Sequence, residues 1–153
     1  MVFEYKWRNY NQKVSAQKAG EFFEELEAAN GYLSEKMVLE ASRPEDALLH
    51  KCFDWDDSSA AEKYRLSQAH IMLANIVKVA VKDEQQTATR AFVNVNPDVT
   101  KKGWYRSIQI ALEDENDREV VLAAAKREMS AFIAKYKNLK ELSNVIKVME
   151  ENL

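Results

Sequence analysis

Apolar and charged residues alternate along the first positions of the chain. Phe3, Tyr5 and Trp7 share one side of this stretch, and charged residues occupy the positions between them. A period of two is typical of an extended backbone, so residues 1–12 are predicted to form a short strand or extended arm. We expect the aromatic side of this arm to dock on the core of the domain.

Residues 15–42 show the pattern of two helices joined by a tight turn. Ser15 and Ser34 stand at the two expected N-caps, because a serine hydroxyl can accept hydrogen bonds from the free amides of a first turn. Gly31 suits the left-handed residue that commonly ends a helix. The segment is therefore predicted to be an N-terminal helical hairpin.

A DNA-reading helix-turn-helix has the same minimal pattern at the sequence level. The second helix, however, carries Glu35 and Glu40, and two carboxylates on so short a reader would repel DNA phosphates. We therefore interpret residues 15–42 as a plain helical hairpin rather than as a DNA-reading element.

Residues 53–57 form a compact aromatic and acidic segment ahead of a long amphipathic helix. Any of residues 57–59 can cap this helix, and Glu62 completes a capping box. The helical spacing predicts a central helix over residues 57–74, with Trp55 as an anchor in the core. The side chains expected on its buried face are Ala61, Tyr64, Ala69, Ile71, Met72 and Leu73.

Three apolar segments predict an antiparallel sheet within residues 76–111. Residues 76–81 are mostly β-branched, residues 87–95 form a second apolar run, and residues 104–111 alternate isoleucine with polar side chains. A polar loop over residues 96–103 separates the second and third predicted strands. We expect one face of this sheet to pack against helices.

Residues 114–151 carry two amphipathic segments, predicted to be C-terminal helices that pack across the sheet. Acidic residues at the start of the first segment and lysines at its end suit the helix dipole. The last apolar stripe could pack on the core or on another chain. It makes the protein a candidate homo-oligomer through Leu142, Val145, Ile146 and Met149. The length fits one domain over residues 1–153, with an α+β fold.

Composition and charge narrow the function classes. Apolar residues make up 46% and charged residues 31%, with three Gly and two Pro, which excludes a disordered or collagenous chain. The net charge is −3, but residues 21–62 hold twelve acids against three basic residues. Contacts to phosphates are therefore expected from basic residues of the arm and sheet: Lys6, Arg8, Lys78, Lys82, Arg90, Lys101, Lys102 and Arg106.

No arrangement of residues indicates catalysis, a metal or a cofactor. Asp54, Asp56 and Asp57 could share a metal ion, but acids ahead of a helix more often cap it. His50 and His70 could serve Cys52 as a base, although nothing in their spacing brings them together. Glycine-rich phosphate cradles are missing from the sequence. We therefore expect a protein that is not an enzyme.

The lone Cys52 cannot form a disulfide within the chain, which favours a reducing compartment. No apolar run approaches the roughly 20 residues that a membrane-spanning helix needs. The sequence therefore predicts a cytoplasmic protein without a membrane segment.

The central run Leu48–Asp57, continued by Ala60–Ala69, resembles small proteins encoded by tailed bacteriophages and prophages. The segment Arg90–Val95 and the pairs Ala131-Phe132 and Lys135-Tyr136 are similar to the same proteins. The resemblance implies a phage accessory protein in a bacterial host cell, of a family without a settled activity or catalytic residues. It also implies an N-terminal helical hairpin of DNA-binding type, from which the acidic hairpin of this chain departs.

We therefore expect a non-enzymatic phage accessory protein that binds nucleic acid or a nucleoprotein. The alternative is a protein-interaction module that inhibits a host defence or nucleic-acid enzyme through an acidic surface. That surface would consist of Glu21, Glu24, Glu25, Asp54, Asp56 and Asp57, facing a basic cleft.

Overall fold

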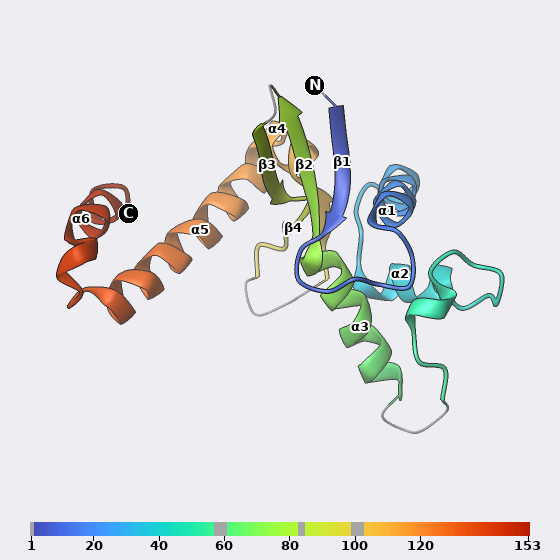
Figure 1. Ribbon diagram of the computed structural model, residues 1–153. Helices are drawn as coiled ribbons and strands as arrows, with labels where there is room; N and C mark the ends of the chain where they lie inside the picture. The colour runs from blue at the N-terminus through green and yellow to red at the C-terminus, as the bar shows by residue number, and fades with distance from the viewer. Residues whose placement is uncertain (1, 57–60, 83–84, 99–102) are drawn as a thin grey trace.

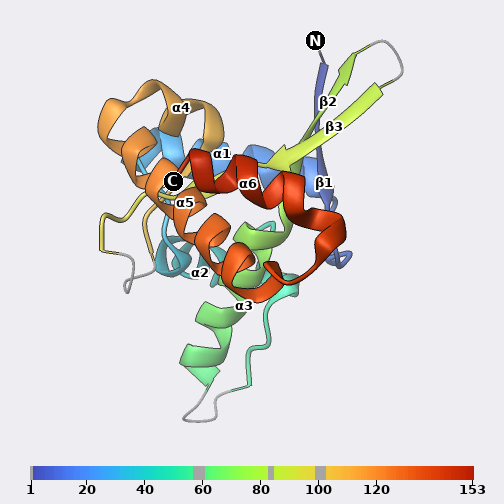
Figure 2. The ribbon, with the colours of Figure 1, turned by 90° about the vertical axis from the view of Figure 1, so that its left-hand side faces the viewer.

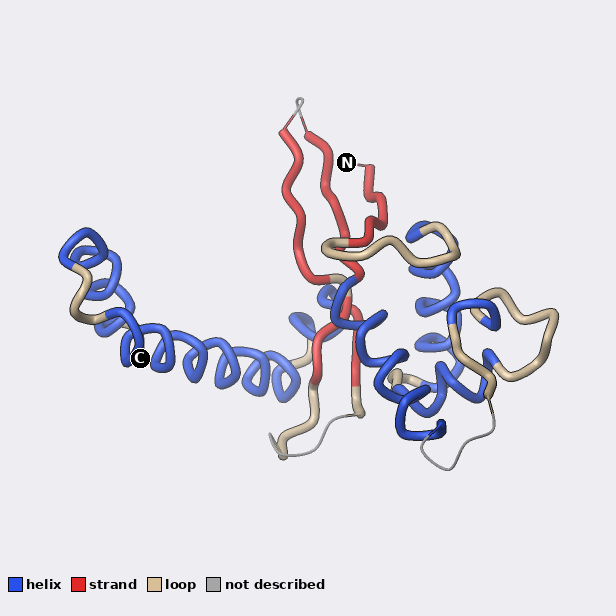
Figure 3. Tube along the Cα trace, turned by 60° about the horizontal axis from the view of Figure 1, so that its bottom comes forward, coloured by secondary structure: helices blue, strands red, loops and turns tan. Residues whose placement is uncertain are grey.

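The computed structural model describes residues 2–56, 61–82, 85–98 and 103–153, without the side chains of Val2, Val81 and Lys82. Two parts can be distinguished in Figures 1 and 3: a head, residues 2–113, and a C-terminal arm, residues 114–153, which extends away from the head. The head contains β1 (Val2–Trp7), α1 (Ala16–Asn30), α2 (Glu35–Ser42), η1 (His50–Cys52), α3 (Ala61–Asn75), β2 (Ile76–Lys82), β3 (Gln85–Arg90), β4 (Phe92–Asn94), β5 (Tyr105–Ser107) and α4 (Ile108–Glu113). The C-terminal arm contains α5 (Glu115–Tyr136), η2 (Lys140–Leu142) and α6 (Ser143–Glu151).

The fold is a mixture of helices and sheet, as predicted, with a three-stranded antiparallel sheet. Its strand order is β1-β2-β3, so the N-terminal arm is an edge strand of the main sheet. The hairpin of β2 and β3, with β1 beside β2, projects beyond the helices of the head (Figure 2). All six residues of β3 are exposed.

The predicted third strand over residues 104–111 is wrong. Its first part is β5, which pairs with β4 in a separate two-stranded sheet, and its second part is the helix α4. Ala, Leu and Glu are strong helix formers, and the run Ala111-Leu112-Glu113 outweighs the short alternation before it. The predicted second strand is interrupted at Ala91, which is buried where the chain passes between the two sheets.

The predicted caps of the first two helices are confirmed. The Ser15 hydroxyl accepts from the Lys18 amide at 3.4 Å, and the Ser34 hydroxyl accepts from the Met37 amide at 3.1 Å. Gly31 ends α1 in the left-handed region with φ 80°. These local signals fixed both helices to within one or two residues of their expected bounds.

The two helices do not form the predicted hairpin in detail. α2 packs chiefly against α3, whereas α1 lies on β1. Gly20 makes this close approach feasible, because a Cβ at that position would lie 2.3 Å from the ring of Tyr5. Tyr5 and Phe23 both contact Phe92, at ring-centroid distances of 6.5 Å and 5.6 Å, so α1 and β1 share the core.

The buried face of α3 differs from the prediction. Tyr64 and Ile71 are 55% and 45% exposed, whereas Arg65 is buried. Phe53 is the more buried aromatic residue ahead of the helix, and Trp55 packs at the margin of the core. The predicted cap at residues 57–59 lies outside the described residues.

The C-terminal helices exist, but they do not pack across the sheet as predicted. No residue of α5 is buried; the helix packs beside α4, and its residues as far as Glu128 border hollows that it shares with the head. The Asp114 carboxylate caps α5 by accepting from the Asp117 amide at 3.0 Å. In Figures 1 and 2 α6 crosses the far end of α5. No helix among the described residues is long and apolar enough to span a membrane.

Candidate functional site

Three of the predicted phosphate-binding residues lie together on one face of the main sheet. In the strand register Lys6 lies opposite Val77, which in turn lies opposite Arg90, so the three side chains share a face. Strands are about 4.8 Å apart, which places the Cα atoms of Lys6 and Arg90 roughly 10 Å apart. Arg8 follows directly after β1, and all three basic side chains are exposed. We call Lys6, Arg8 and Arg90 the sheet cations.

Lys78 lies on the opposite face of the sheet and is engaged within the chain. Its Nζ is 3.5 Å from Glu24 Oε1. The same ammonium group lies over the rings of Phe3 and Tyr5, at 4.9 Å and 5.6 Å from their centroids. Lys78 is therefore a structural cation between the sheet and α1, and it is not available to a phosphate.

Arg106 is also engaged, and it fastens the C-terminal arm to the head. Its Nε donates to the carbonyl oxygen of Gly31 at 3.0 Å. Its Nη1 lies 2.6 Å from Asp117 Oδ2 and 3.8 Å from Asp114 Oδ2. The guanidinium therefore neutralises two carboxylates at the start of α5, and its main role is structural.

Three further predicted residues cannot be placed. Lys101 and Lys102 lie outside the described residues, and so does the side chain of Lys82. Their contacts to phosphates stay predictions.

An isolated backbone bridge brings two exposed aromatic residues together. The Leu33 amide donates to the Tyr105 carbonyl, and the Tyr105 amide donates to the Leu33 carbonyl, both at 2.7 Å. Tyr32 and Trp104 are diagonal neighbours on one side of this antiparallel bridge, within reach of each other for aromatic side chains, and their ring centroids lie 5.8 Å apart with planes 53° apart. Tyr32 is 39% exposed and Trp104 is 52% exposed.

The aromatic pair borders a hollow of about 690 Å³ between the two-stranded sheet and the start of α5. This volume lies within the range of small-molecule sites, about 300–1,000 Å³. The lining is mainly apolar, with Arg127 as an exposed cation, and Arg106 and Asp117 neutralising each other in its wall. The remaining lining residues are Val95, Pro97, Asn116, Glu119, Val120 and Ala123. We call this site the aromatic hollow.

Sequence reasoning missed Tyr32, Trp104 and Arg127 as site residues. Their apposition depends on the Leu33–Tyr105 bridge, which joins segments far apart in the chain. One local signal was present: Tyr32 and Trp104 each follow a glycine with positive φ, at 80° and 130°. An aromatic residue directly after such a turn is readily left at the surface.

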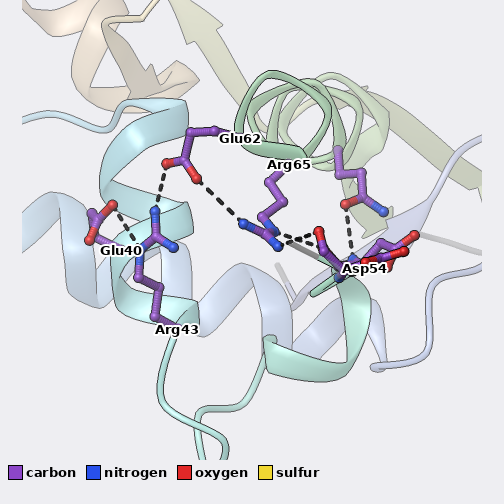
Figure 4. Close-up of polar contacts among 7 residues, drawn as sticks. Glu40, Arg43, Asp54, Glu62 and Arg65 are labelled. Carbon is purple, nitrogen blue, oxygen red and sulfur yellow. Dashed lines mark hydrogen bonds and ion pairs between the residues drawn. The ribbon is translucent and has the colours of Figure 1, made fainter. Parts of the chain in front are cut away.

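The acidic segment before α3 is held by Arg65, as Figure 4 shows. Arg65 Nε donates to the carbonyl oxygen of Asp54 at 2.7 Å, and Nη2 donates to that of Asp56 at 3.0 Å. Glu62 joins this group to α2, because its carboxylate lies 3.6 Å from Arg65 Nη1 and 2.6 Å from Arg43 Nη2. The segment is therefore a structural turn around a buried arginine.

Trp55 and His50 complete this turn. Their rings are stacked 4.6 Å apart, and the Trp55 indole N–H donates to the His50 carbonyl oxygen at 2.7 Å. The Arg65 guanidinium lies 5.0 Å from the centre of the Trp55 ring. His50 Nδ1 is 3.0 Å from the Ser42 carbonyl oxygen, so the histidine also contacts the end of α2. Cys52 is half-buried, and burial raises the pKa of its thiol.

The acids of the alternative binding surface are divided between two places. Glu24 accepts a hydrogen bond from the Tyr5 hydroxyl and pairs with Lys78, whereas Glu21 and Glu25 are exposed on α1. Burial, followed by the Glu24 carboxylate, raises the pKa of the Tyr5 hydroxyl. Asp54 and Asp56 belong to the turn before α3, and Asp57 lies outside the described residues.

A cluster of polar side chains joins α2, α3 and β5. Glu35 Oε1 accepts from the Tyr105 hydroxyl at 3.0 Å, and His70 Nδ1 lies 3.1 Å from the same carboxylate oxygen. Burial and the Glu35 charge raise the pKa of Tyr105. The phenol is therefore held neutral as a hydrogen-bond donor. His70 Nδ1 also lies 3.0 Å from the Tyr105 hydroxyl, so the three side chains of the cluster connect α2, α3 and β5 of the head.

Within the described residues, no three His, Cys, Asp or Glu side chains are grouped so that they could hold a metal ion. Comparisons with models of protein families, with curated proteins and with solved structures find no match to the chain. The aromatic hollow and the sheet cations are accordingly the candidate binding surfaces of the protein.

Proposed function

We propose that the protein is a non-enzymatic accessory protein that binds single-stranded nucleic acid, in the phage context that the sequence resemblance implies. The observation that carries the proposal is the exposed Tyr32–Trp104 pair at the edge of the aromatic hollow. Aromatic rings stack on nucleobases regardless of sequence, and one such contact is worth about 1–3 kcal/mol.

Charge around the hollow supports the same proposal. Arg127 is exposed in its lining, and Lys101 and Lys102 are only a few residues before Trp104 in the chain. Among the described residues of the lining, Arg127 is the cation available to a phosphate backbone beside stacked bases, and such a contact would make binding weaken with salt. The carboxylate of Glu119 opposes this attraction, so affinity depends on stacking at least as much as on charge.

The sheet cations provide a second cluster of positive charge on the head. Lys6 and Arg90 flank Val77, and no acid among the described residues forms an ion pair with either of them or with Arg8. Asp83 and Glu84, which separate β2 from β3 in the sequence, are acidic, so the end of the hairpin that holds Lys6 and Arg90 is the part that suits phosphate. We assign the sheet cations an auxiliary role in holding the backbone of the strand.

The experiment is a titration of fluorescently labelled single-stranded and duplex DNA at low and moderate salt, read by anisotropy. Trp104→Ala is expected to weaken single-strand binding about 5- to 100-fold, the range that the loss of one stacking contact implies. Tyr64→Ala is the matched control, because Tyr64 is also exposed but lies on α3 and not in the hollow. Absence of binding by the unmodified protein, or equal weakening by both variants, would refute the proposal.

A cation test complements this titration. Arg127→Glu is expected to weaken binding and to reduce its salt dependence. Arg106 is unsuitable for this purpose, because its replacement would also release Asp117 and Gly31 and loosen the C-terminal arm. Arg118→Glu is the control, since Arg118 is exposed on α5 but does not line the hollow.

A further inference from the structure

The C-terminal arm carries apolar side chains that a single chain leaves uncovered. Both of its α-helices lie wholly within the described residues; no residue of α5 is buried, and Ile146 alone is buried in α6. Leu122 is 54% exposed, and Val145 and Val148 are 49% and 59% exposed. Most helices in proteins are stabilised by the packing of an apolar face, so α5 lacks the cover that its composition calls for.

The sequence of α5 contains the repeat of a helix that pairs with another helix. Apolar residues recur at alternate spacings of three and four, which is the heptad pattern of a coiled-coil seam. The seam consists of Leu122, Ala125, Met129, Phe132 and Tyr136. The rings of Phe132 and Tyr136 lie 4.9 Å apart, and both residues are half-buried near η2 and α6, so the free part of the seam centres on Leu122.

The distribution of charge along the C-terminal arm indicates which partner covers this seam. Residues 113–121 hold five acids and one arginine, whereas residues 126–140 hold five basic residues and one glutamate. When two identical helices lie antiparallel, the acidic half of each faces the basic half of the other. A parallel arrangement would instead place like charges together, which is unfavourable.

We propose that a second copy of this chain covers the arm, with two α5 helices antiparallel about a two-fold axis. Such an interface is isologous, because the same seam contributes from both copies. Each α5 is about 33 Å long at 1.5 Å per residue, so the two heads stand at opposite ends of the paired helices. No residue of the seam lines the aromatic hollow, whereas Ala125 also lines the cavity beside His70, so pairing leaves the aromatic hollow open.

This arrangement differs from the oligomer that was predicted from the last apolar stripe of the sequence, which consists of Leu142, Val145, Ile146 and Met149. Ile146 is buried and Leu142 and Met149 are half-buried, which leaves Val145 as the one exposed residue of that predicted set. The structure therefore moves the interface from α6 to the middle of α5. The inference stands apart from nucleic-acid binding, since it uses a different face of the helix.

The first test is the mass of the full chain by light scattering, from about 1 to 100 μM, the affinity range of modest interfaces. The expected mass is twice the 17.6 kDa of one chain, and Leu122→Asp is expected to reduce it to that of one chain. Leu112→Asp is the matched control, because Leu112 is a 46% exposed leucine on the head. A one-chain mass for the unmodified protein, or a two-chain mass in Leu122→Asp, overturns the proposal.

The second test separates pairing from the favourable effect of the same charges on the dipole of a single helix. One variant carries Glu115→Lys and Glu119→Lys, and the other carries Lys135→Glu and Lys137→Glu. Each alone cancels the net charge of one half of the paired region, which removes the attraction between two identical copies, and is expected to be monomeric. An equimolar mixture restores one pair of oppositely charged halves and is expected to form a mixed dimer. A mixture that stays monomeric, or either variant dimerising alone, contradicts antiparallel pairing.

Discussion

Arg106 and Asp117 join the head to the C-terminal arm, with Nη1 2.6 Å from Oδ2. The same guanidinium donates to the Gly31 carbonyl at the end of α1, so one side chain connects α1, β5 and α5. The aromatic hollow lies at this junction. Its shape therefore depends on a contact that is electrostatic and partly exposed.

Replacement of Arg106 should loosen this junction. Arg106→Ala is expected to lower the free energy of unfolding by about 1–2 kcal/mol, because it removes charge-assisted hydrogen bonds from a partly exposed site. Arg118→Ala should change stability by less than about 0.5 kcal/mol, since Arg118 is exposed on α5. Urea unfolding followed by circular dichroism measures both values, and equal values would argue against the role of Arg106.

Among the arginines of the head, Arg65 is expected to cause the largest loss of unfolding free energy when it is replaced. Arg65→Met removes donors from the carbonyl oxygens of Asp54 and Asp56 while keeping much of the side-chain volume. We expect a loss of about 1.5–3 kcal/mol, because the hydrogen bonds of a buried guanidinium to two partly buried carbonyl oxygens are removed. Arg43→Met, in an exposed ion-pair group, should cost clearly less stability than Arg65→Met. The comparison is made by urea unfolding, and a larger loss for Arg43 would contradict this account of the turn.

Gly20 should tolerate no side chain while Tyr5 is present. Gly20→Ala is expected to destabilise the protein by about 1–3 kcal/mol, although alanine is by itself the better helix former. In Tyr5→Ala the same glycine replacement should become neutral or stabilising. A thermal double-mutant cycle measures this coupling. Additive effects would mean that the two residues do not limit each other.

Tyr5 and Tyr105 should ionise only above the range of ordinary tyrosines. Their pKa values are raised by burial and by Glu24 and Glu35, respectively. In the unfolded protein the pKa of a tyrosine is about 10, and in the folded protein the pKa of these two residues is higher. The resulting stabilisation is fully present below about pH 10 and is lost as the pH rises from there through the folded-state pKa. Absorbance titration should show that Tyr5 and Tyr105 ionise only when the protein unfolds. Ionisation of all tyrosines near pH 10 in the folded protein would contradict the assignment.

The sequence was a good guide where a local signal decides the structure. Ser15, Ser34, Gly31 and Asp114 mark helix ends through contacts within a few residues, and each takes the expected part. The alternation of the N-terminal residues likewise predicted a strand, now seen as β1. Such signals do not tell which strand pairs with which.

The features that the sequence did not predict depend on contacts between distant segments of the chain. Pairing of β1 with β2, the burial of Arg65 and the apposition of Tyr32 and Trp104 each depend on partners that no local pattern names. Charge counting also overstated the phosphate surface, because Lys78 and Arg106 were counted as free cations although carboxylates neutralise them. Chain-wide charge patterns could not reveal that pairing.

Stacking of nucleobases on Trp104 is tested most directly by the three indole N–H signals of the protein. The Trp7 and Trp55 indoles donate to the carbonyl oxygens of Val14 and His50, whereas Trp104 is exposed, so two signals serve as internal controls. They can be assigned with Trp104→Phe and followed by nuclear magnetic resonance while single-stranded DNA is added. We predict a shift of the Trp104 signal alone that saturates with DNA. No shift, or the same shift at all three indoles, would contradict binding at the aromatic hollow.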